Sequence, residues 1–208
     1  MLNRKYIYVN LLLIAVFFAV FNIQAQMSVK PGLRGGFSFS TISEMHADYK
    51  TDFYAGGFTE IKITRIYSLQ PEINYSRQGS NNVARNFYDE NTQTNRTEHL
   101  DLEINYLSLS VMNKFTLKQG LQFQAGPTLD ILLNDNLAVR KAQNDLGLVL
   151  GVAYALPSGL TFEARFKKGL LDVLSSDYYQ NDSNNYYLFG DYNTNINFQL
   201  GVSYSFGK

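Results

Sequence analysis

The stretch TNINFQLGVSYSF at residues 194–206 decides the fold. Its even-numbered residues from Ile196 to Phe206 are apolar, whereas the odd-numbered residues from Asn195 to Ser205 are polar or glycine. Because successive side chains of a strand point to opposite faces, this strand has one apolar and one polar face. Its length matches the roughly 9–11 residues that a tilted strand needs to cross a bilayer. The pattern predicts a strand of a transmembrane β-barrel.

Seven further segments have the same two-residue period, so we expect an all-β, eight-stranded antiparallel up-and-down transmembrane barrel. The expected strands are 31–41, 53–64, 66–77, 102–116, 121–132, 145–156, 160–170 and 194–206. Two irregularities stand out: Pro71 suggests a bulge, and the apolar parity changes between Tyr106 and Leu107, where a second bulge is expected to reverse the facing.

The connections between these strands alternate in length. Those after the second, fourth and sixth strands are tight, whereas about 42–52, 78–101, 133–144 and 171–193 are long and polar. Outer-membrane barrels have this asymmetry, with short periplasmic turns and longer loops outside. We therefore expect the long loops to lie outside the cell.

The N-terminus predicts export. Arg4 and Lys5 precede the apolar run 11–21, and Ala25 ends a cleavage-like site. This is the pattern of a secretory signal peptide, and the run is short for a transmembrane anchor. We expect residues 1–25 to be removed and 26–208 to form one barrel domain.

Composition narrows the classes of partner. The signal peptide contains two of the 18 basic and none of the 18 acidic residues, so the remaining chain has a formal charge of −2. No nucleic-acid partner is expected from this balance. With no cysteine, neither disulfides nor thiolate metal sites stabilise the fold. We expect no cofactor and no metal.

The alternation alone does not say which face points outward, since a periplasmic lipocalin-like barrel binding an apolar ligand has its apolar face inside. The polar face here is mostly Ser, Asn, Gln, Gly and Thr, which suits a narrow lumen better than a water-exposed surface. The charged residues expected inside are Arg34, Glu60, Lys62, Glu72, Lys114, Asp130, Glu163, Arg165 and Lys167. Because the set contains five basic and four acidic residues, we expect most of these charges to form ion pairs across the lumen. Aromatic girdles are expected at the ends of the strands, from Tyr67, Tyr75, Tyr154, Tyr204 and Phe206.

Three segments resemble a known family. GLRGGFSFS at 32–40, the hairpin 53–80 with its most specific piece LQPEINYSRQG at 69–79, and GVSYSF at 201–206 are similar to the Bacteroidetes outer-membrane β-barrel family often called PorT-like. The resemblance covers essentially the whole mature chain and implies an eight-stranded barrel in the outer membrane of a Gram-negative bacterium. It implies no specific biochemistry, because a fold does not fix a function. Gly207 and Lys208 depart from the aromatic ending of many such barrels.

No catalytic motif is evident, and we expect a monomer with a structural or interaction role: envelope integrity, adhesion or docking to another envelope component. Outer-membrane lipid and lipopolysaccharide are the expected surroundings, and the Tyr- and Asn-rich loop 175–195 and the charged loop 79–100 are candidate contacts for an envelope protein. The alternative is a lipid-modifying enzyme that uses His46 beside Ser43, Glu44 and Asp48.

Overall fold

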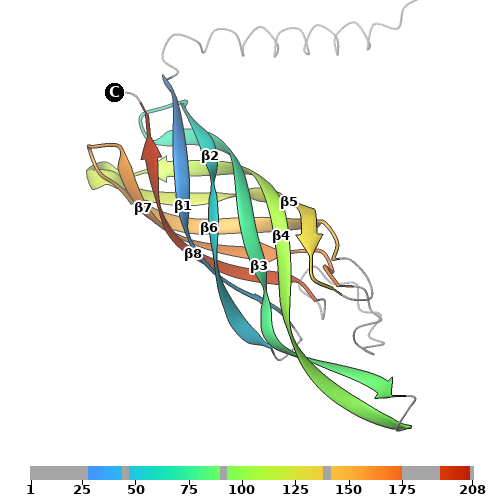
Figure 1. The fold of residues 1–208 in the computed structure, drawn as a ribbon. Coiled ribbons are helices and arrows are strands. Elements are labelled where there is room, and N and C mark those ends of the chain that lie inside the picture. Colours follow the sequence, from blue (N-terminus) through green and yellow to red (C-terminus); the bar gives the residue numbers. More distant parts are fainter. Residues whose placement is uncertain (1–27, 44–46, 90–92, 138–141, 175–192, 207–208) are drawn as a thin grey trace, which may run out of the picture.

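The computed structural model describes residues 28–43, 47–89, 93–137, 142–174 and 193–206. These residues form eight antiparallel strands, each paired with its neighbours in sequence, and β1 pairs with β8 to close the barrel (Figure 1). The strands are β1 (Ser28–Ile42), β2 (Asp48–Lys62), β3 (Tyr67–Asp89), β4 (Thr94–Thr116), β5 (Leu121–Asp135), β6 (Asp145–Ala155), β7 (Leu160–Gly169) and β8 (Asn195–Ser205). The predicted up-and-down barrel is confirmed.

The tight connections all lie at one end of the barrel, here called the short-turn end; the opposite end is the long-loop end. The β4–β5 connection contains the single turn of 3-10 helix η2 (Lys118–Gly120), where Gln119 and Gly120 have positive φ. The β6–β7 turn closes through Gly159, whose φ is 91°. No helix among the described residues is long and apolar enough to cross a membrane.

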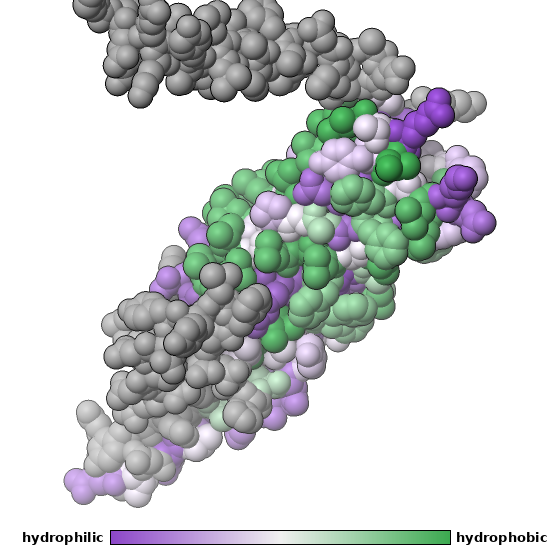
Figure 2. All heavy atoms as spheres, turned by 180° about the vertical axis from the view of Figure 1, so that it is seen from behind, coloured by the Kyte–Doolittle hydropathy of each residue, from purple (hydrophilic) through white to green (hydrophobic). Residues whose placement is uncertain are grey.

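The predicted facing holds on nearly every strand. Leu200 and Val202 of β8 are exposed on the outside, whereas Gln199 and Ser203 are buried inside. The outer wall is consequently apolar over the barrel, and polar side chains gather at its ends (Figure 2). An apolar ligand has no apolar lumen to enter, so the lipocalin-like alternative is wrong.

Large inward side chains fit because glycines face them. A side chain at Gly201 would overlap the hydroxyl of Tyr54, and one at Gly151 would press on the side chain of Arg165. These two glycines give the lumen the volume that its aromatic and guanidinium groups occupy.

The first prediction that the structure overturns concerns the loops. We expected a polar loop over 78–101, but β3 continues to Asp89 and β4 begins at Thr94. The expected loop 42–52 is likewise shortened by the start of β2 at Asp48, and β5 extends to Asp135. Backbone pairing continues beyond the apolar band, where sequence periodicity no longer marks it.

The bulge predicted at Pro71 is absent, and the bulge predicted near Tyr106 and Leu107 is not on β4 but on the neighbouring strand β5. The β3–β4 register runs unbroken past Pro71, and the β2–β3 pairs on either side of Pro71 keep the same register. At Tyr106 and Leu107, β4 pairs regularly with β3, so its facing does not reverse. The irregularity lies instead on β5, where Leu133 is the extra residue between two paired neighbours. Leu102, Ile104 and Tyr106 therefore point inward, where they have an apolar environment.

Candidate functional site

The middle of the lumen holds a buried network of two arginines and two glutamates. Arg34 of β1 donates to Glu72 of β3 at 2.6 Å and to Glu163 of β7 at 2.6 and 2.9 Å. Arg165 of β7 donates to both oxygens of Glu72, at 2.8 and 2.9 Å, and to Glu163 at 3.1 Å. Two positive and two negative charges thus compensate one another across the barrel, as a desolvated site requires.

Aromatic side chains support the cations of the lumen. The Arg34 guanidinium lies 4.7 Å from the ring centre of Tyr54, whose hydroxyl donates to Glu163 at 3.2 Å. The Lys114 ammonium lies 6.0 Å from the ring centre of Phe58. Neither ring was predicted from the sequence to have a role. The available signal was an aromatic residue, Tyr54, that shares its parity with the charged positions of the expected strand 53–64.

Charge compensation continues towards the long-loop end. Lys167 donates to Asp130, and Gln78 donates to the same carboxylate at 3.2 Å. The cavity that remains between these layers has only about 20 Å³, with Arg165 and Ser108 among its lining. That is room for about one water molecule. Eight of the nine charged residues expected inside are buried, and the exception is Lys62, which is exposed at the short-turn rim.

An apolar plug closes the lumen at the long-loop end. Its buried members come from the strand ends and from the connections that fold over the mouth: Ile42, Val83, Leu102, Ile104, Tyr106, Ala142, Val173 and Leu174. The Tyr106 hydroxyl donates to the carbonyl of Gln143 at 3.1 Å, which ties the β5–β6 connection to the wall. Plug and ion network together leave the described lumen without a continuous passage.

A two-stranded hairpin projects past the plug. The ladder with β2 ends at Asn81 and the ladder with β5 ends at Ile104, but β3 and β4 remain paired from Val83–Leu100 to their tips (Figure 1). A strand rises about 3.3 Å per residue, so residues 83–89 of β3 extend roughly 20 Å beyond the closed wall.

A bulge marks the point where this hairpin leaves the barrel. Two residues of β3, Asn81 and Asn82, lie opposite Asp101 alone. Asn82 has a φ of 57°, a left-handed conformation that asparagine tolerates, and its backbone N–H donates to the Asp101 carboxylate at 2.9 Å. The bulge changes the direction of the hairpin and orients the side chain of Val83 inward, where it packs in the plug.

Aromatic rings pair at the short-turn end of the outer wall, as the girdle prediction required there. Tyr67 and Phe115 have ring centres 5.2 Å apart, and Tyr204 and Phe206 5.4 Å apart. Tyr75 lies further along β3, where its hydroxyl donates to Asn105 at 3.0 Å. Tyrosines with an apolar ring and a bonded hydroxyl are suited to the edges of a hydrocarbon layer.

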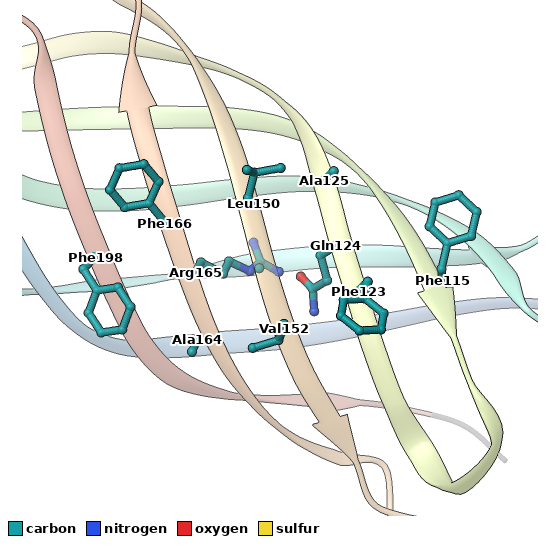
Figure 3. Close-up of a pocket in the computed structure, with 11 residues that line it drawn as sticks. Phe115, Phe123, Gln124, Ala125, Leu150, Val152, Ala164, Arg165, Phe166 and Phe198 are labelled. Carbon is teal, nitrogen blue, oxygen red and sulfur yellow. The ribbon is translucent and has the colours of Figure 1, made fainter.

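An apolar groove of about 490 Å³ crosses the outer wall over β5, β6 and β7 (Figure 3). Ala125, Val152 and Ala164 lie on this part of the wall, with Phe123 and Phe166 on either side, while the side chain of Arg165 lies on the luminal side of the strands. A second groove of about 430 Å³ shares Val152 and Ala164 and extends towards Tyr154.

Of the four loop residues named for the catalytic alternative, the structure describes Ser43 and Asp48, and these two have different hydrogen-bond partners. Ser43 exchanges hydrogen bonds with Thr194 at 3.0 Å, and Asp48 accepts from Asn82 at 3.3 Å. Glu44 and His46 lie outside the described residues, as do residues 175–192 of the loop 175–195. Among the described residues no three His, Cys, Asp or Glu side chains are grouped to hold a metal ion.

Several solved barrels are similar to this chain in fold. Neisserial surface protein A is 14% identical, with a TM-score of 0.49, and the match covers 87% of this chain and 99% of that one. Ail, the attachment invasion locus protein of Yersinia pestis, is 11% identical with a TM-score of 0.47, and the match covers 85% of this chain and 98% of that one. OprG from Pseudomonas aeruginosa is 13% identical with a TM-score of 0.46, and the match covers 89% of this chain and 99% of that one.

At the level of sequence, no curated protein matches the chain. Residues 24–175, well over half of the chain, match the family described as the outer membrane protein beta-barrel domain. The eight-stranded closure, the apolar outer wall and the polar lumen agree with that match. The chain therefore belongs to the outer membrane protein β-barrel domain family and is an integral protein of a Gram-negative outer membrane.

Proposed function

We propose that this barrel is a sealed membrane anchor that presents the β3–β4 hairpin to an envelope protein outside the membrane. The observation that carries the proposal is the combination of a closed lumen with a hairpin that continues beyond every other described strand. A sealed barrel supports docking rather than transport.

The hairpin has the features of a strand-addition site. From Val83 and Leu100 outward, no third strand pairs with it among the described residues. An isolated two-stranded ribbon is marginally stable in water, and its open edges are templates for another strand. Thr97, Glu98 and His99 are exposed there. The proposed occupant is an extended segment of the partner.

Site-specific photo-cross-linking in native envelopes tests this proposal. A cross-linking residue at Glu98 or His99 is expected to capture one and the same protein, and one at Ser158, on the opposite rim, is expected not to capture it. Replacing residues 84–99 by an Asn-Gly turn joins the paired residues Val83 and Leu100 and should abolish capture while the barrel still forms. Recovery of lipopolysaccharide alone from both positions would contradict docking.

For the lipid surroundings, we propose that the apolar groove around Ala125 and Ala164 seats an acyl chain of an outer-membrane lipid. Its support is the position of the groove on the wall that faces hydrocarbon, with small residues between Phe123 and Phe166. Replacing Ala164 with Phe fills the groove. Native mass spectrometry should then show fewer co-purified lipids; an unchanged lipid count would oppose the assignment.

We also propose that the chain belongs to the PorT-like branch and acts as a monomer without catalysis. Its most specific segment, 69–79, supplies an inward polar column: Glu72 accepts from Arg165 and Gln78 donates to Asp130 across the lumen, while Gln70 donates to Glu72 on the same strand. A closed barrel has no free wall edge for self-association. Light scattering in detergent tests the monomer, and unchanged lipid A acylation after His46→Ala tests the absence of catalysis.

For the N-terminus, the proposal is cleavage after Ala25, supported by the charged start, the apolar run and the small residue at the site. The intact mass of the protein purified from envelopes tests it. A mass that includes residues 1–25 would contradict cleavage and favour an N-terminal anchor.

A further inference from the structure

The short-turn end of the barrel contains a large cavity, lined by polar and apolar groups alike, that the docking role does not use. It has a volume of about 740 Å³, within the range of small-molecule sites. Inward residues at the ends of β1, β2 and β7 contribute to its lining, together with the β2–β3 and β6–β7 turns. The ion network of Arg34 and Glu72 lies deeper in the lumen, and with the apolar plug beyond it the cavity is a vestibule rather than a channel.

Positive charge predominates in this vestibule. Lys30, Lys62 and Arg65 line it, against the single carboxylate of Glu60. None of these three cations forms an ion pair within the described part of the chain. The deeper lumen differs, because its arginines are matched by carboxylates. Unpaired cations around one concave site concentrate anions there.

The wall of the vestibule also presents hydrogen-bonding groups. Glu60 accepts from Ser68 at 3.1 Å and has further acceptor capacity. Gln122 donates from Nε2 to Thr116 at 3.2 Å, but its Oε1 has no partner, although the residue is only 5% exposed. A buried acceptor without a partner is costly, so a donor from a ligand would satisfy it.

We propose that the vestibule binds a small anionic sugar, carrying a phosphate or a carboxylate. Its charged group binds between Lys30, Lys62 and Arg65, and its hydroxyls donate to Gln122 Oε1 and Glu60. The cavity faces the compartment on the short-turn side, so the ligand is supplied from the periplasm. The site is at the opposite end from the hairpin and is independent of docking.

Isothermal titration of the mature protein in phosphatidylcholine nanodiscs tests the proposal. The probes are glucose 6-phosphate, glucuronate, glucose and inorganic phosphate. Binding of glucose 6-phosphate or glucuronate, at least tenfold tighter than that of glucose and of inorganic phosphate, is expected. Whichever of the two acids binds identifies the anionic group. Equal binding by glucose would overturn the role of charge, and equal binding by inorganic phosphate would overturn the sugar.

Two variants provide the controls. The double substitution Lys62→Gln and Arg65→Gln should weaken binding roughly tenfold or more, because charge-assisted contacts are lost. Lys118→Gln removes a cation at the same rim that does not line the cavity, and should change affinity less than about twofold. Equal weakening by both variants would show a diffuse charge effect and overturn the site. Heat-modifiable gel migration verifies that each variant is folded.

Discussion

Replacing Glu72 with Gln removes one negative charge from the buried ion network while keeping the shape of the side chain. Glu72 accepts from Arg34 at 2.6 Å, from Arg165 at 2.8 and 2.9 Å and from Gln70 at 2.7 Å. After the change, the two guanidinium groups share only Glu163, so one positive charge is uncompensated in the lumen. Breaking a buried pair on one side costs about 3–5 kcal/mol, and we expect a loss of this size in the free energy of unfolding.

Reversible urea unfolding in lipid vesicles measures this loss. Because the chain has no tryptophan, far-ultraviolet circular dichroism and the gel migration of the folded form serve as the signals. Glu103→Gln is the matched control: its carboxylate pairs with Lys50 at 3.1 Å but the side chain is 41% exposed, so its loss should cost less than about 1 kcal/mol.

A double variant distinguishes the effect of the uncompensated charge from the effect of the lost hydrogen bonds. Adding Arg165→Met to Glu72→Gln leaves Arg34 paired with Glu163 and restores neutrality. Groups in one network couple by about 0.5–3 kcal/mol, so the double variant should be more stable than the sum of the two single losses predicts. Strict additivity, or a loss below about 1 kcal/mol for Glu72→Gln, would refute the argument that the lumen depends on compensated charge.

Two further pairs of substitutions, assayed by the same unfolding measurement, test the outward facing of the wall and the packing of the lumen. Leu148→Arg, on the outer face of β6, should lower the free energy of unfolding by about 2–4 kcal/mol, whereas Leu117→Arg at the short-turn end should lower it by about 0–1 kcal/mol. Equal losses would contradict a hydrocarbon layer centred on the strands. Gly201→Ala should cost about 1–3 kcal/mol because its methyl group would displace Tyr54, whereas Gly57→Ala, whose methyl group meets only ordinary contacts, should leave the lumen unchanged; a well-tolerated Gly201→Ala would show that the lumen is not tightly packed there.

The barrel itself could be predicted from sequence because lipid on one side and a narrow polar lumen on the other impose a two-residue period on every strand. The inward charges followed from the same parity, and eight of the nine are buried. At the long-loop end, the rule that apolar residues face outward gave the wrong facing. There, Leu102, Ile104 and Tyr106 obey the alternation of β4 but face an apolar plug instead of a polar lumen, so a change of environment was read as a change of facing.

The projecting hairpin could not be predicted for a related reason. The sequence of residues 84–99 has no hydrophobic period. Beyond Val83 and Leu100, the described parts of β3 and β4 pair only with each other, so backbone pairing alone continues these strands. The vestibule was missed because Lys62 was counted among charges of a closed interior. Its position at the end of β2, next to the turn with Arg65, was the available signal for a rim location.

The central claim is that hydrocarbon contacts the apolar face of these strands, and single cysteines in β8 test it most directly. The chain has no native cysteine, so Leu200, Val202, Gln199 and Ser203 can each be replaced and labelled with a fluorophore in vesicles. Quenchers attached to lipid tails should quench labels at Leu200 and Val202 and leave labels at Gln199 and Ser203 unaffected. The reverse pattern, with Leu200 and Val202 shielded inside and Gln199 and Ser203 reached from the bilayer, would contradict the account.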